Sequence, residues 1–93
     1  MLIEKIGTKE MLIQLAEECS ELSQACLKYV RYLNDVNPTF KTEDVILDNL
    51  HEEYADVRIC LEELKDGKVI DVDKVVDWMQ RKRDRIEERF SES

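Results

Sequence analysis

The sequence predicts an all-α protein in which three long helices form a single domain over residues 1–93. Two glycines and one proline leave few breaks in the chain, and 43% hydrophobic with 39% charged residues is the mixture that amphipathic helices need. Apolar residues recur at alternating spacings of three and four, which is typical of helices packed through one side. We therefore expect a compact bundle of three helices, completed by homo-oligomerisation.

The first helix is expected over about residues 8–34. Thr8 can cap its first amides, and the turn formers of residues 34–38 end it because Pro38 disfavours a helix at the residue before it. Its apolar stripe is Leu12, Leu15, Cys19, Leu22, Cys26, Val30 and Leu33. Such a helix is about 40 Å long, whereas a compact chain of this size is roughly 32 Å across. We therefore expect an elongated layer whose apolar edges are buried in a homodimer or a dimer of dimers.

The second helix is expected to start near Thr42 and to stop at Lys65-Asp66-Gly67. Its inner side is Ile46, Leu50, Val57, Leu61 and Leu64. The third helix starts near Asp71, and its apolar residues are Val72, Val75, Val76, Met79, Ile86 and Phe90. Residues 91–93 should fray.

Charge and hydropathy narrow the classes of partner. A formal charge of -8 opposes binding to a nucleic-acid polymer or an anionic membrane, because both require a basic surface. The first six residues lack the apolar core of a signal peptide, and no stretch approaches the roughly 18 apolar residues of a membrane span. We expect a cytoplasmic protein.

Cys19, Cys26 and Cys60 are an odd number of cysteines without CxxC spacing. Reduced and mostly buried thiols are the expected state. The alternative is a reactive thiol, which would need a lowered pKa and access to solvent.

Two acidic motifs, residues 17–21 (EECSE) and 52–56 (EEYAD), stand out along the two first helices. Carboxylates three residues apart share a helix face, where like charges cost roughly 0.2 to 0.5 kcal/mol per pair. On a helical wheel both motifs border the apolar stripe, so they should lean toward one helix interface. Magnesium prefers hard oxygen ligands of this kind. Either motif alone is more often a solvated acidic face, and that alternative stays open.

A di-iron carboxylate bundle is the competing metal site. It requires ExxH motifs on facing helices, and the sequence has none. His51 projects away from the Asp56 side of its helix, which favours a surface position.

The two acidic motifs and their flanking residues, 15–25 and 52–57, resemble the EExxE and ExxD signature of the MazG-like all-alpha nucleoside triphosphate pyrophosphohydrolases. The resemblance implies that four residues bind Mg²⁺, with Mn²⁺ as a substitute: Glu18, Glu21, Glu53 and Asp56. It implies that Glu17 or Glu52 serves as a further ligand, a base or a supporting partner. The implied reaction converts a nucleoside triphosphate to the monophosphate and pyrophosphate, in the manner of nucleotide-pool cleansing.

Candidate substrate-binding residues lie in three places. Lys28 follows the first acidic motif, and Asn49 shares a face with Glu53. Lys82 and Arg85 belong to residues 80–89, which carry +2 in an acidic chain and resemble late basic positions of the family. The alternative for this segment is a helix end whose cations suit the dipole and pair with acids four residues away. Tyr29, Tyr32, Tyr54 and Trp78 are more often core or interface than base-stacking residues.

Two other functions remain open. One is a noncatalytic helical module for dimerisation or partner binding, which would have the acidic faces without the chemistry. The other is hydrolysis of phosphoribosyl-ATP, a branch of the same family. Product analysis separates the latter from hydrolysis of nucleoside triphosphates.

Overall fold

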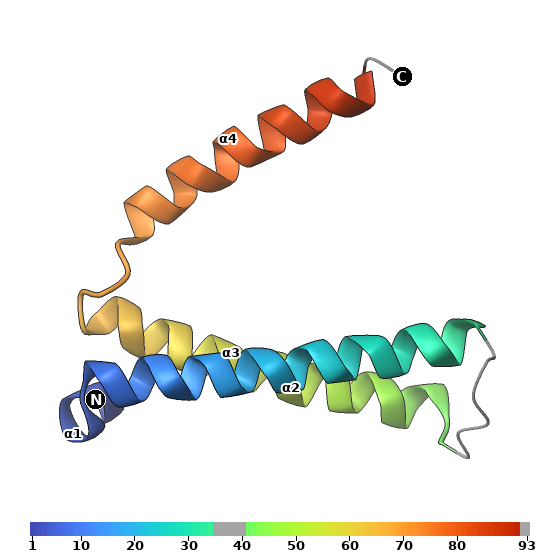
Figure 1. Cartoon of the computed structure of the whole chain (residues 1–93), viewed down its shortest axis with the longest axis horizontal. Coiled ribbons are helices and arrows are strands. Elements are labelled where there is room, and N and C mark those ends of the chain that lie inside the picture. The colour runs from blue at the N-terminus through green and yellow to red at the C-terminus, as the bar shows by residue number, and fades with distance from the viewer. Residues whose placement is uncertain (35–40, 92–93) are drawn as a thin grey trace.

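A computed structural model describes residues 1–34 and 41–91, and every element in these ranges is a helix (Figure 1). The helices are α1 (Leu2–Ile6), α2 (Thr8–Asn34), α3 (Glu43–Asp66) and α4 (Val72–Ser91). The all-α class and the three long helices are confirmed. The short helix α1 was not predicted, and most of the predicted turn after Asn34 lies outside the described residues.

The short helix α1 packs against the end of α3. Ile3 is buried, and its N–H donates to Glu63 Oε1 over 2.7 Å. Gly7 separates α1 from α2 with a φ of 88°, a backbone conformation that glycine adopts without strain. Thr8 is the first residue of α2, so the helix starts one residue earlier than a cap at Thr8 would require.

The helices α2 and α3 form an antiparallel hairpin that contains most of the core (Figure 1). At one end a buried cluster joins α1, α2 and α3, with Leu15 and Ile70 packed against it: Ile3, Met11, Cys60 and Leu64. Ile46, Val57 and Ala25 are the other buried residues. The predicted inner side of α3 is confirmed, because its five residues are all buried or half-buried.

The predicted stripe of α2 is only partly correct. Met11 and Ala25 are buried against α3, whereas Leu12 and Leu33 are 45% and 61% exposed. Cys19 and Cys26 are also exposed, so the expectation of buried thiols holds for Cys60 alone. The physical reason is that a single neighbouring helix covers a narrower strip than the apolar stripe of α2.

The predicted start and stop of α3 and the predicted start of α4 are confirmed, and side-chain caps account for both starts. Thr42 Oγ1 accepts from the Val45 N–H over 3.4 Å, and Asp71 Oδ1 accepts from the N–H groups of Asp73 and Lys74 over 3.0 and 3.4 Å. Gly67 follows α3 and allows a close approach, since a Cβ there would lie 2.7 Å from Ile3 Cδ1.

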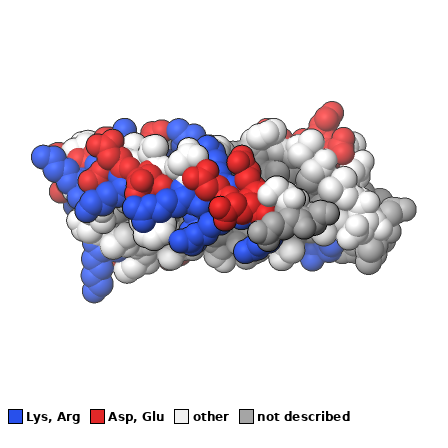
Figure 2. Space-filling view, turned by 90° about the horizontal axis from the view of Figure 1, so that it is seen from above, with Lys and Arg blue, Asp and Glu red and all other residues white. Residues whose placement is uncertain are grey.

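The last helix, α4, diverges from the hairpin (Figure 1). None of its residues is buried, and it makes no extended contact with the other helices. The radius of gyration is 17.1 Å, against about 12 Å for a compact chain of this length. The single chain is therefore an extended layer, as expected from the length of its helices, and α4 does not complete a compact bundle within the chain. Seen from the α4 side, basic and acidic residues are interleaved on the surface (Figure 2).

Among the described residues, no helix combines the length and the apolar character that crossing a bilayer requires.

Candidate metal centre

Three carboxylates from two helices meet at the α2–α3 interface. Glu18, Glu53 and Asp56 each offer an oxygen, and these oxygens lie within 4.8 Å of one another. All three side chains are half-buried. Among the described residues, this trio is the candidate cation site.

Helix periodicity explains this convergence. Met11, Glu18 and Ala25 recur every seven residues along the side of α2 that faces α3, and Ile46, Glu53 and Cys60 do the same on α3. Glu18 and Glu53 therefore occupy positions where apolar residues stand one repeat earlier or later. Asp56, three residues after Glu53, lies on the adjoining side of α3.

The other predicted acidic residues lie around this centre. Glu21 is exposed and outside the trio, yet its charge raises the pKa of Glu53 and so places it nearby. Glu52 is exposed and also raises the pKa of Glu53. Glu17 is exposed and belongs to neither the trio nor the neighbouring cleft.

Burial and like charge both act on Glu53. Loss of solvent contact raises its pKa, and the negative charges of Glu21, Asp56, Glu52 and Glu18 raise it further. A carboxylate in this setting holds its proton more tightly than an isolated one. A bound cation would relieve the same repulsion.

Cys60 lies beneath the carboxylates. Burial raises the pKa of its thiol, and the charges of Glu18 and Asp56 raise it further. A thiol with a raised pKa is a poor nucleophile, so the structure favours a packing role for Cys60 over the reactive alternative.

A small cleft of about 260 Å³ lies between α2 and the start of α3. Lys28, Asn49 and Glu52, three of the predicted site residues, line it together with Lys41. Asp48 lines the cleft as well, so the two ammonium groups and the Asn49 amide share it with two carboxylates.

Lys82 and Arg85 lie on α4, so a single chain does not bring them to the carboxylates (Figure 1). Other side chains of this segment pair with acids four residues away along α4. Arg81 pairs with Asp77, and Gln80 donates to Asp84. These contacts match the alternative interpretation of residues 80–89 as a solvated helix surface.

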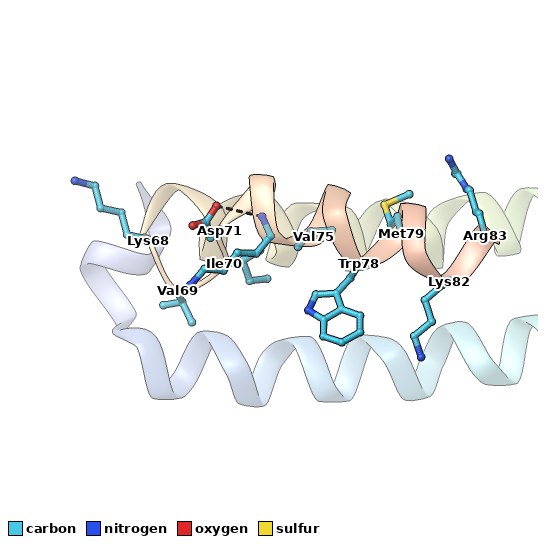
Figure 3. Close-up of a pocket in the computed structure, with 10 residues that line it drawn as sticks. Lys68, Val69, Ile70, Asp71, Val75, Trp78, Met79, Lys82 and Arg83 are labelled. Carbon is cyan, nitrogen blue, oxygen red and sulfur yellow. Dashed lines mark hydrogen bonds between the residues drawn. The ribbon is translucent and has the colours of Figure 1, made fainter. Parts of the chain in front are cut away.

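A hollow of about 760 Å³ lies beside α4 and not at the carboxylates. Trp78 and Lys82 project to the same side of α4 (Figure 3), and Val69 and Ile70 of the preceding linker line the same hollow. Trp78 is half-exposed, and the Arg81 guanidinium lies 4.7 Å from its ring centroid.

The tyrosines occupy separate places. Tyr29 and Tyr32 stack with ring centroids 6.1 Å apart, and Tyr29 donates to Glu43 over 3.1 Å. Loss of solvent and this bond raise the pKa of Tyr29. Tyr54 is 53% exposed on the side of α3 away from Asp56. His51 is exposed, as predicted.

Two residues near the site were missed by the sequence reasoning. Gln14 donates to Glu18 Oε1 over 2.7 Å, one helical turn before it, and its i,i+4 spacing is visible in the sequence. Lys41 stands before the cap of α3, where no periodicity marks it, so only the folded hairpin brings it next to Lys28.

Comparison with protein-family models, with curated proteins and with solved structures finds no match to this chain.

Proposed function

We propose that the protein is a Mg²⁺-dependent nucleoside triphosphate pyrophosphohydrolase that releases pyrophosphate and a nucleoside monophosphate. The observation that carries the proposal is the convergence of Glu18, Glu53 and Asp56 from two helices onto one half-buried point. The acidic motifs that resemble the MazG-like family supply these three residues, with Glu21 beside them.

The donor set suits magnesium. Carboxylate oxygens are hard ligands, and ligands on opposite sides of Mg²⁺ are about 4 Å apart at its usual bond length. Oxygens within 4.8 Å of one another therefore need only small side-chain adjustments to share an ion. Three protein ligands leave octahedral positions for phosphate oxygens and water. Mn²⁺ has similar preferences and is the expected substitute.

When bound, the ion would offset the negative charge that develops on the phosphate oxygens during cleavage. Lys28 would bind the phosphate tail from the neighbouring cleft, and Lys41 lies beside it to do the same. Asn49 would orient the sugar or hold a carboxylate. Glu52, exposed at the edge of that cleft, would accept a proton from the attacking water, and Glu17, which lies outside the cleft, is the second candidate.

The test is a panel of canonical and modified nucleoside triphosphates, with phosphoribosyl-ATP included, incubated with protein and Mg²⁺. Pyrophosphate release is expected, and Glu53→Gln should reduce it at least about a hundredfold because the trio loses one anionic ligand. Glu88→Gln on α4 is the matched control and should retain activity. Helical circular dichroism must be intact in both variants.

Release of orthophosphate in place of pyrophosphate would contradict the proposed cleavage position. Activity that survives Glu53→Gln would contradict the proposed metal centre.

A second candidate is a noncatalytic helical module that binds a partner. The exposed apolar residues of α2, α3 and α4 favour it, because a monomer rarely exposes large contiguous apolar patches without an interaction. Under this function Mg²⁺ would leave the melting temperature unchanged, whereas a ligand that binds only the folded chain raises it.

A further inference from the structure

Among the described residues, Gln14 is the hydrogen-bond donor to the carboxylate trio. Its amide Nε2 donates to Glu18 Oε1 over 2.7 Å, from one helical turn earlier on α2. This length is at the short end of the range for N–H···O bonds, as expected when the acceptor carries a charge. Glu18 is half-buried, whereas Gln14 is exposed. The bond therefore links the surface of α2 to a carboxylate at the α2–α3 interface.

Glu18 is the member of the trio that most needs such a contact. Glu53 and Asp56 are three residues apart on α3, so the helix itself keeps their side chains adjacent. Glu18 is the member that comes from α2, and a glutamate has several rotatable bonds through which it can turn its carboxylate toward solvent. A hydrogen bond to one of its oxygens restricts that freedom. The orientation of Glu18 thus decides whether the two helices can share one cation.

The bond also makes the two oxygens of Glu18 different. Oε1 accepts from the Gln14 amide, which leaves Oε2 as the oxygen better able to face a cation. Metal-binding carboxylates are commonly held in this way by a hydrogen-bonding partner that is not itself a ligand. Binding through both oxygens would compete with the Gln14 bond, because Oε1 would have to turn toward the ion.

Ligation through one oxygen discriminates between divalent cations. Mg²⁺ requires a near-ideal octahedron, and the two oxygens of one carboxylate are closer together than its edge of roughly 2.9 Å, so each carboxylate gives it one oxygen. Ca²⁺ is larger, takes about six to eight oxygens and accepts both oxygens of a carboxylate. A Glu18 that is free to turn would therefore favour Ca²⁺, and a Glu18 held by Gln14 favours Mg²⁺.

We propose that Gln14 is a positioning residue that sets the preference of the trio for Mg²⁺ over Ca²⁺, by holding Glu18 as a ligand through one oxygen. This role rests on the proposed metal centre and adds to it a residue outside both acidic motifs. Gln14 acts through Glu18 and is not itself a ligand.

A purely structural role for Gln14 has a different signature. A glutamine four residues before an acidic residue stabilises an isolated helix slightly. Losing only that effect would lower the melting temperature of the metal-free chain and leave the relative affinity for the two cations unchanged. The ratio of the two dissociation constants is therefore the decisive quantity.

The test is isothermal titration calorimetry with Mg²⁺ and with Ca²⁺, each added alone to metal-free protein. Gln14→Met keeps the length and the helix propensity of the side chain and removes the N–H donor. We expect the dissociation constant for Mg²⁺ to rise about tenfold, the lower end of the usual effect of losing a supporting partner. That for Ca²⁺ should change by less than about threefold, because the freed carboxylate can offer it a second oxygen.

Two further variants serve as controls. Gln24→Met makes the same change at another exposed glutamine of α2, more than one turn beyond Glu18, and should leave both constants unchanged. Glu53→Gln removes a ligand and should weaken the binding of both ions. Circular dichroism must show the same helix content in all variants.

Three results would contradict this role. The same ratio of constants in Gln14→Met, Gln24→Met and the natural chain would overturn it and leave the metal centre standing. An equal loss of affinity for both ions in Gln14→Met would mean that Gln14 supports the centre without selecting the ion, which overturns the selectivity. A natural chain that binds neither ion would overturn this role and the proposed metal centre together.

Discussion

The two sides of the α2–α3 hairpin differ in what they expose, although both are built from the same seven-residue spacing. On one side carboxylates, lysines and an asparagine gather beside Glu18, Glu53 and Asp56. On the other, Leu12, Tyr54 and their neighbours form an exposed apolar face. The difference shows that one helix pair can carry a polar side and an exposed apolar side independently, because each lies on a different side of the shared core.

Removing the shared core should damage both sides at once. Leu64 is fully buried in the cluster with Ile3, Met11 and Cys60, so Leu64→Ala should lower the free energy of unfolding by about 2 to 5 kcal/mol. Urea denaturation in a chelator measures it. Leu27→Ala, at a solvent-exposed position of α2, is the control and should change stability by less than about 0.5 kcal/mol.

An equal loss in the two variants would contradict the packing described for Leu64.

Magnesium should act on the acidic side only. At ten times its dissociation constant, a ligand of the folded state adds about 1.4 kcal/mol. For a domain of this size each kcal/mol shifts the melting temperature by about 4 to 8 °C, so we expect a rise of roughly 6 to 11 °C. Differential scanning calorimetry with and without Mg²⁺ measures it.

Glu53→Gln should abolish this rise, whereas Tyr54→Glu on the apolar face should retain it at protein concentrations where both chains are in the same oligomeric state. A rise of the same size in Glu53→Gln would mean that Mg²⁺ acts elsewhere.

The smallest expected effect is on pH dependence without metal. The folded chain raises the pKa of Glu53 above its ordinary value of 4.5, so between the two values the folded state binds more protons than the unfolded state. Stability must then fall as pH rises from about 4.5 through the folded pKa. Glu53→Gln should reduce this decline and be the more stable protein at pH 7 in a chelator.

Melting temperatures between pH 4 and 8 provide the measurement, with Glu88→Gln to account for the general effect of removing one negative charge. A decline as steep in Glu53→Gln as in the Glu88→Gln control would contradict the shift at Glu53.

Local rules predicted much of the fold. The two ends of α3 and the start of α4 followed from Thr42, Gly67 and Asp71, whose bonds involve neighbours within four residues. The buried side of α3 followed from the helical spacing of its apolar residues. The short helix α1 could not be predicted in this way, because its position depends on a bond from Ile3 to Glu63, sixty residues away.

The candidate site was predictable to the same extent. Both motifs bordered an apolar stripe, which was enough to expect Glu18, Glu53 and Asp56 at one interface. The sequence could not tell which acidic residues join the trio and which only lie beside it, because Glu21 differs from Glu18 only by its rotation about α2. Lys41 lies in no periodic segment, and only the folded hairpin puts it next to Lys28.

By itself, the amino-acid sequence determined the helical class, the bounds of the three long helices and the acidic motifs, because these depend on backbone propensity and on contacts within one or two turns. The tertiary structure alone decided which part of each stripe is buried. A stripe specifies a side of a helix, whereas its partner and the angle of approach depend on contacts made outside that helix, such as the packing of Ile70 against the buried cluster before α4 begins.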